Sequence, residues 1–161
     1  MQKLAFLFPG QGAQSVGMGK DLFEQSPAAR AVYEKADALL GYSISKICFE
    51  GPEPELTRTL YAQTAIFVTS MAALASLREK AGDVRPALAA GLSLGEFTAL
   101  VAAEAISFEE ALKLINVRAE AMDSAARQNP GTMASIMGLG AEACKNIAQE
   151  AGCEVANLNT P

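Results

Sequence analysis

The chain has 161 residues, of which 50% are hydrophobic and 19% charged, a composition typical of a globular domain rather than a disordered segment. The net charge of −5 argues against a nucleic-acid partner, because such proteins neutralise phosphates with an excess of lysine and arginine. No apolar run looks long enough to cross a bilayer and no signal peptide is evident, so we expect a cytoplasmic protein without a membrane partner.

Two residue counts limit the chemistry. The sequence contains no histidine, which is the most common base for a serine nucleophile. A serine nucleophile here would need a carboxylate or lysine base, or a base from polypeptide outside these residues. Cys48, Cys144 and Cys153 share no metal or redox spacing, so we expect reduced core residues, no metal site and no cofactor.

The first predicted element is a strand at residues 4–8, because a continuous apolar run is typical of a parallel strand buried on both faces. A glycine-rich loop follows at residues 9–19. Its glycines would let the backbone approach a ligand closely, although a flexible connector explains them equally well.

Two helices come next. Ser26 and Pro27 are typical of a helix start, and Gly41 ends that helix. A longer helix is predicted at residues 61–80, and its middle is apolar almost all round, which indicates burial on every side. Gln63 lies at the polar start of this helix, where it either caps the helix or faces a cleft.

Residues 87–97 carry the most informative pattern. A short apolar run ends in Gly91-Leu92-Ser93-Leu94-Gly95, which matches the G-x-S-x-G turn between a strand and a helix. Glycines allow the tight bend, which would expose the Ser93 hydroxyl and direct the Leu94 N–H toward a developing negative charge. A plain glycine turn would show the same pattern.

A further helix is predicted to begin at the capping box formed by Ser107 and Glu110. Arg118 lies on its apolar stripe, together with Ala111, Ile115 and Met122. A buried guanidinium is costly unless it meets an anion. The pattern leaves two possibilities, a structural pair with an aspartate or glutamate and recognition of a substrate carboxylate.

The chain turns near residues 128–131. The alternation of residues 132–138 then predicts a strand, and we expect a helix at 141–151 and a second strand at 153–158. Strands and helices in this order predict an α/β fold with a change of subdomain near residue 128.

Several stretches together resemble the malonyl-CoA:acyl carrier protein transacylases of fatty-acid synthesis, over the whole chain. They are Phe8-Pro-Gly-Gln-Gly-Ala-Gln14, Gln63-Thr-Ala, Gly91-Leu-Ser-Leu-Gly-Glu96, Arg118 with Pro130-Gly-Thr-Met-Ala134, and Asn157-Leu-Asn-Thr-Pro161. The family fold is an α/β-hydrolase-like large domain with an inserted ferredoxin-like small domain. The resemblance therefore implies that residues 1–127 are an incomplete large domain and that residues 128–161 begin the small one.

The resemblance also implies roles for individual residues. Ser93 would be the nucleophile that takes the acyl group, and the backbone amides of Gln11 and Leu94 would form the oxyanion hole. Arg118 would bind the malonyl carboxylate, and Gln63 would line the same cleft. Asn159 matches a cleft asparagine of the family. Malonyl-CoA would be the substrate, and acyl carrier protein with its phosphopantetheine arm would be the acceptor.

The sequence departs from the family pattern in two places. Leu92 stands where many members have a histidine immediately before the nucleophile. The family is also roughly twice this length, and its catalytic histidine lies in the C-terminal half that these residues do not include. We therefore expect the chain alone to be inactive without that half. A serine thioesterase or other hydrolase is the alternative function, although it leaves Arg118 and the loop around Gln11 unexplained.

Overall fold

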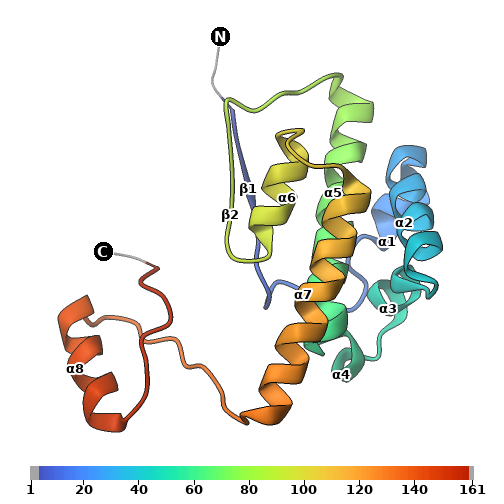
Figure 1. Ribbon diagram of the computed structural model, residues 1–161. Coiled ribbons are helices and arrows are strands. Elements are labelled where there is room, and N and C mark those ends of the chain that lie inside the picture. Colours follow the sequence, from blue (N-terminus) through green and yellow to red (C-terminus); the bar gives the residue numbers. More distant parts are fainter. Residues whose placement is uncertain (1–3, 160–161) are drawn as a thin grey trace. The chain divides into compact units, whose positions relative to one another are not determined.

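The computed structural model describes residues 4–159, and the chain divides into two compact units, here called the N-terminal unit (to Gln128) and the C-terminal unit (from Asn129). The boundary lies beside the one expected from the sequence. The N-terminal unit contains a small parallel sheet and seven described helices, labelled in Figure 1: β1 (Ala5–Phe8), α1 (Lys20–Gln25), α2 (Pro27–Leu40), α3 (Ile44–Glu50), α4 (Glu53–Leu56), α5 (Thr59–Ala81), β2 (Leu88–Gly91), α6 (Gly95–Ala102) and α7 (Phe108–Gln128).

The sheet consists of β1 and β2, which pair in parallel with Ala5 opposite Leu88 and Phe8 opposite Gly91. Helix α6 follows β2 directly and packs against both strands. The other face is open, since Leu7 is 75% exposed and Leu88 60% exposed. The run at residues 4–8 was thus rightly predicted to be a strand, but its burial on both faces was wrong for the described residues.

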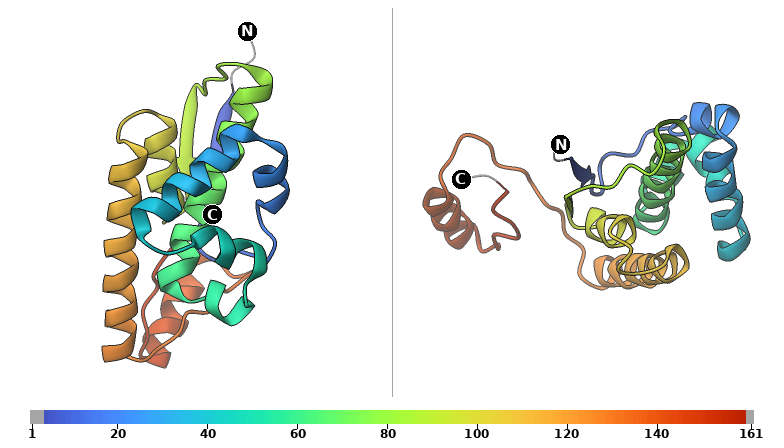
Figure 2. Two further views of the ribbon diagram at one scale, coloured as in Figure 1. Left: turned by 90° about the vertical axis from the view of Figure 1, so that its right-hand side faces the viewer. Right: turned by 90° about the horizontal axis from the view of Figure 1, so that it is seen from above.

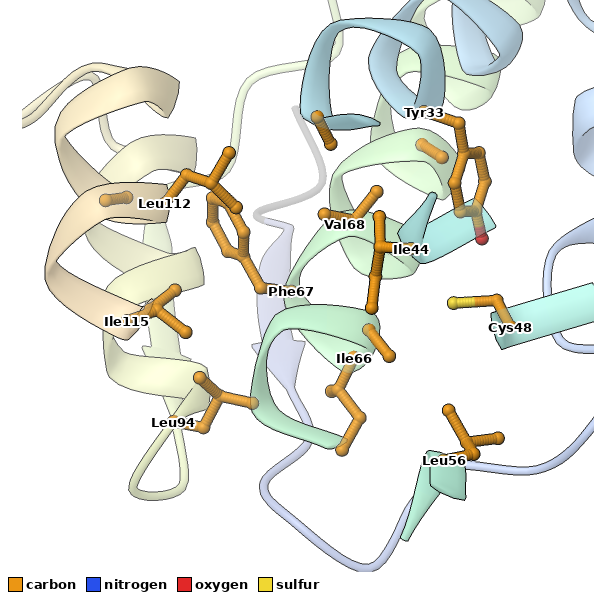
Figure 3. Packing of buried hydrophobic residues seen from close by; sticks show 14 of the residues in the cluster. Tyr33, Ile44, Cys48, Leu56, Ile66, Phe67, Val68, Leu94, Leu112 and Ile115 are labelled. Carbon is orange, nitrogen blue, oxygen red and sulfur yellow. The ribbon is translucent and has the colours of Figure 1, made fainter. Parts of the chain in front are cut away.

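The core lies around α5, which α2 and α7 flank on two sides (Figure 2). The ten labelled side chains of Figure 3 converge here from several helices: Tyr33, Ile44, Cys48, Leu56, Ile66, Phe67, Val68, Leu94, Leu112 and Ile115. Phe67 of α5 stacks on Phe108 of α7 with ring centroids 5.2 Å apart. The nearly continuous burial of α5 between Ala62 and Val68 agrees with its apolar pattern.

By length and composition α5 could cross a membrane, with a mean hydropathy of 1.4 over its most apolar window. This differs from the expectation that no apolar run is long enough. Within the N-terminal unit, however, 56% of that window is buried against other parts of the protein. The packing is typical of a central core helix.

The predicted helix starts are confirmed. The Ser26 hydroxyl caps α2 by accepting a hydrogen bond from the Ala29 N–H at 3.1 Å. At α7 the capping box is complete, because Ser107 N–H donates to the Glu110 carboxylate at 2.9 Å and Glu110 N–H donates to Ser107 Oγ at 3.2 Å. These contacts satisfy amides that would otherwise lack a partner at the first turn.

The C-terminal unit contains α8 (Ala141–Ala151), as expected, but its two predicted strands are wrong. Residues 132–138 and 153–158 are irregular, and Met133 and Met137 are 82% and 88% exposed. A strand needs a partner for its backbone groups and a surface for its apolar face. Among residues 129–159 these two segments obtain neither, so alternation alone does not produce a strand.

Of the three cysteines that were predicted to lie in the core, only Cys48 does so. Cys48 is buried, and burial raises the pKa of its thiol to about 12. Cys144 is half-buried and Cys153 is exposed, and neither forms a disulfide among the described residues. The expectation of core positions is therefore wrong for both.

Candidate active site

The turn between β2 and α6 has the geometry that its sequence predicts. Ser93 has a φ of 53°, a left-handed conformation that is uncommon for residues other than glycine and that clusters at functional sites. A Cβ atom on Gly91 would collide with the Gly95 carbonyl group, so the bend closes only with glycine at that position. The result is an exposed serine at the tip of a constrained strand-to-helix turn.

The loop after β1 lies against this turn. Leu92 N–H donates to the Phe8 carbonyl oxygen at 3.2 Å, and a Cβ atom on Gly10 would lie only 2.7 Å from the Leu92 carbonyl oxygen. A Cβ atom on Gly95 would collide with the Phe8 carbonyl group from the other side. Gln11 therefore sits on a loop that is packed against the Ser93 turn, as expected of a close-approach loop.

Arg118 of α7 contacts Ser93, although the two residues are 25 positions apart in the sequence. Its Nη2 donates to Ser93 Oγ at 2.7 Å, and its Nη1 donates to Gln63 Oε1. The guanidinium also lies over the Phe97 ring, 6.0 Å from the centroid. Within residues 4–159 no aspartate or glutamate forms an ion pair with Arg118, so the structural pair considered from the sequence is not found.

Gln63 is fully buried and faces this cluster rather than capping α5. Its Nε2 donates to Met122 Sδ at 3.2 Å and lies 3.5 Å from Gln11 Oε1. Gln11 Nε2 in turn donates to Thr59 Oγ1 at 3.4 Å. The resemblance implied that Gln63 and Gln11 belong to one site, and their side chains meet here. The sequence placed Met122 on the stripe of Arg118 without a role in the site, and it did not single out Thr59.

A signal for both missed residues exists in the helical spacing. Thr59 precedes Gln63 by one turn of α5, and Met122 follows Arg118 by one turn of α7. Residues four apart share a helix face, so Thr59 lies on the face of Gln63 and Met122 lies on the face of Arg118. This spacing already places Met122 on the apolar stripe of Arg118, and the same spacing places Thr59 beside Gln63.

Two backbone amides predicted for the oxyanion hole make no hydrogen bond of their own among the described residues. Leu94 lies at the N-terminal cap of α6, where the helix dipole favours negative charge. In the described part of the chain, neither the Leu94 N–H nor the Gln11 N–H donates a hydrogen bond. Both amides thus keep the capacity that an oxyanion hole needs.

Asn159 belongs to the C-terminal unit, where it is exposed at the end of an irregular segment. The two units are described separately, so its predicted place in the cleft stays a prediction. Among residues 4–159 no cluster of histidine, cysteine or acidic side chains could hold a metal ion. The described residues around Ser93 offer a hydroxyl, a guanidinium, carboxamides and backbone amides.

Comparison with known proteins gives a consistent picture. The family model described as "Acyl transferase domain" matches residues 5–161. The malonyl CoA-acyl carrier protein transacylase of Bacillus subtilis is 45% identical over 166 residues, covering 100% of this chain and 52% of the relative. A probable mitochondrial malonyl-CoA-acyl carrier protein transacylase of Drosophila melanogaster is 53% identical over 131 residues, covering 80% of this chain and 34% of the relative.

Solved structures agree with these relatives. A malonyl CoA-acyl carrier protein transacylase from Burkholderia pseudomallei superimposes with a TM-score of 0.83 at 39% identity, covering 94% of this chain and 50% of that one. The chain spans about half the length of the Bacillus subtilis relative that it matches. The neighbours have an α/β fold, of which this chain shows a mostly helical part with a small parallel sheet. On the family match across nearly all its residues, the chain belongs to the acyl transferase domain family.

Proposed function

We propose that the protein containing this chain transfers a malonyl group from malonyl-CoA to acyl carrier protein through an ester on Ser93. The observation that carries this proposal is the 2.7 Å contact between Arg118 Nη2 and Ser93 Oγ. Among the described residues Arg118 has no carboxylate partner. An unpaired guanidinium beside a nucleophile is suited to bind a substrate that itself carries a carboxylate. The names of the relatives support the same substrates.

In the first half-reaction Ser93 Oγ attacks the thioester carbonyl carbon, while its proton passes to a base. The carbonyl oxygen becomes an oxyanion, which the Gln11 and Leu94 amides bind. Each donor of this kind lowers the barrier by roughly 3 kcal/mol. The C–S bond then breaks, and the coenzyme A thiolate leaves with the proton returned from the base.

In the second half-reaction the phosphopantetheine thiol of acyl carrier protein passes its proton to the base and attacks the malonyl ester. The bond from Ser93 Oγ to the carbonyl carbon then breaks, and Oγ takes the proton back from the base. One solved neighbour is a type II PKS acyl carrier protein in complex with its malonyl-transacylase, with a TM-score of 0.79 and 36% identity. That complex supports an acyl carrier protein as the acceptor for this chain as well.

Arg118 selects the acyl group in this scheme. The malonyl carboxylate is separated from the reacting carbonyl by a single methylene, and Arg118 is close enough to Ser93 to bind the carboxylate while Ser93 attacks. Its contact with the buried Gln63 holds one nitrogen of the guanidinium in place, and further N–H groups remain for the carboxylate. An acetyl group has no carboxylate to use this contact.

A histidine base would have to come from other polypeptide, because the sequence contains no histidine. We propose that it lies in the C-terminal half that the longer relatives possess, together with the strands that would complete an α/β-hydrolase-like domain and a ferredoxin-like small domain. Asn159 would join the site in that context. A cytoplasmic location stays a prediction, since the relatives include proteins named mitochondrial.

A serine hydrolase is less well supported. Hydrolysis needs the Ser93 turn and the oxyanion amides, but it has no use for a guanidinium held beside the nucleophile. Arg118 and its contact with Gln63 are explained by transfer of a dicarboxylic acyl group and left unexplained by simple ester cleavage.

The experiment that tests the proposal is intact-mass analysis after malonyl-CoA is added to the intact protein without an acceptor. We expect a stable malonyl ester on Ser93, which disappears when holo acyl carrier protein is added. Ser93→Ala should carry no adduct, whereas the matched control Ser124→Ala, at an exposed serine of α7, should behave like the unaltered protein. Rapid hydrolysis of malonyl-CoA without an adduct, or an adduct that persists in Ser93→Ala, would contradict the proposal.

A further inference from the structure

The Gln11 side chain is held at both ends by one helix. Its Nε2 donates to Thr59 Oγ1 at 3.4 Å, and its Oε1 lies 3.5 Å from Gln63 Nε2. We infer that Thr59 is a positioning residue for acyl transfer, which fixes the Gln11 loop so that the Gln11 N–H faces the oxyanion. This inference rests on the proposed function and adds a residue that the sequence did not single out.

The direction of these hydrogen bonds follows from Arg118. A guanidinium can only donate, so the Gln63 oxygen must face it. The Gln63 NH₂ group then faces Gln11 Oε1, and the Gln11 NH₂ group is left to face Thr59. Arg118 donates to Ser93 on one side, and on the other side the donor-to-acceptor order runs from Arg118 through Gln63 and Gln11 to Thr59, which supplies the last acceptor.

The loop packs against the Ser93 turn at Gly10, but beyond that contact few backbone hydrogen bonds fix Gln11. Gly10 and Gly12 flank Gln11, and Gly12 has a φ of 109°, which only glycine adopts readily. The Gly12 N–H is used locally, donating to Gln14 Oε1 at 2.8 Å. The next backbone contact with another element comes only at Gly17, whose N–H donates to the Cys48 carbonyl at 2.8 Å.

The support itself is rigid. Thr59 is the first residue of α5 and Gln63 lies one turn further, so both project from the same face of one helix. Gln63 is fully buried, and the residues that follow it up to Val68 are buried in the core. The Gln11 side chain is hydrogen-bonded to this helix and is therefore held in a fixed position.

Removing the Thr59 hydroxyl leaves the Gln11 NH₂ group without its acceptor and the loop with one tether instead of two. The Gln11 amide then spends less time at the oxyanion position. Loss of a whole oxyanion donor costs about 10²- to 10³-fold in kcat, so we expect partial misplacement to cost about tenfold. KM for malonyl-CoA should change little, because Arg118 still binds the carboxylate.

The test compares Thr59→Val, Thr59→Ser and the control Thr57→Val in the intact protein. Valine keeps the shape without the hydroxyl, whereas serine keeps the hydroxyl. Thr57 is a nearby exposed threonine whose Oγ1 donates to the Glu53 carbonyl at 2.9 Å, away from the Gln11 loop. Malonyl transfer is measured as kcat and KM, and thermal unfolding is measured alongside.

The inference predicts a kcat about tenfold lower for Thr59→Val, with KM and unfolding temperature nearly unchanged. Thr59→Ser should restore the rate to within about twofold, and Thr57→Val should match the unaltered protein. Equal rates in Thr59→Val and the unaltered protein would overturn it, as would equal losses in the valine and serine variants. Failure of the proposed function is distinct, since the unaltered protein would then transfer no malonyl group.

Discussion

Both units of the molecule contain segments that the sequence predicts to be strands, but strands form only in the N-terminal unit among the described residues. In the N-terminal unit a short apolar run becomes a strand, because β1 finds β2 as a partner and α6 as a cover. In the C-terminal unit two runs that were also predicted to be strands stay irregular and exposed. A helix satisfies its own backbone and forms in both units, whereas a strand depends on what lies beside it.

The same difference separates the chemistry of the units. Every side chain shown to approach Ser93 comes from the N-terminal unit and is held by core helices α5 and α7. Of the described residues beyond 128, only Ala148 is buried. Perturbations of equal kind should therefore have large effects in one unit and small effects in the other.

The largest contrast is expected from truncating one large side chain in each unit. Phe67→Ala removes a fully buried ring that stacks on Phe108, and such changes cost about 3–5 kcal/mol of unfolding free energy. Met137→Ala removes a side chain that is 88% exposed and should cost less than about 0.5 kcal/mol. Urea unfolding of both variants measures this, and similar losses would show that the C-terminal unit has a core of its own.

A smaller contrast is expected from adding one methyl group at a glycine. In Gly95→Ala the new Cβ would collide with the Phe8 carbonyl, so the Ser93 turn must shift, at a cost of about 2 kcal/mol. In Gly138→Ala the new Cβ meets no atom within 4 Å. The cost in unfolding free energy is about 1 kcal/mol, because alanine is strained at a φ of 82°. Only Gly95→Ala should slow acyl transfer, and equal rates in the two variants would mean that the turn tolerates displacement.

The smallest effect is expected from pH at the starts of α7 and α8. Hydrogen bonds from the Ser107 hydroxyl and amide hold the pKa of Glu110 below its ordinary value of 4.5. A carboxylate with a depressed pKa stabilises the folded state above its unfolded pKa, and this contribution is lost as the pH falls through the folded value.

Helix α8 has no side-chain cap at Gly140 and serves as the internal reference. Amide protection at the start of α7 should fall relative to α8 on acidification below about pH 4.5, and Glu110→Gln should abolish this difference. Parallel loss of protection at both helices would exclude the capping box as its cause.

Much of the site could be predicted because its signals are local. The glycines around Ser93 dictate the bend, and the apolar stripe on α7 places Arg118 toward the interior. The contact of Arg118 with Ser93 joins elements distant in sequence, and only the resemblance to a family suggested it. The partner of Gln63 could not be chosen from its position alone, since a helix start offers both capping and burial.

What could not be predicted depends on tertiary partners. The alternation at 132–138 carries no information about whether a neighbouring strand is present, and among the described residues none is. The short helices α1, α3 and α4 were also missed. They are four to seven residues long, too short to show a clear apolar period.

The claim that matters most is that Arg118 binds the substrate carboxylate beside Ser93. The direct measurement is the rate of malonyl transfer and of acetyl transfer in the intact protein and in Arg118→Ala. Loss of a charged hydrogen-bonding partner predicts a fall of roughly 10²-fold for malonyl transfer and little change for acetyl transfer. Equal losses for the two acyl groups would contradict it.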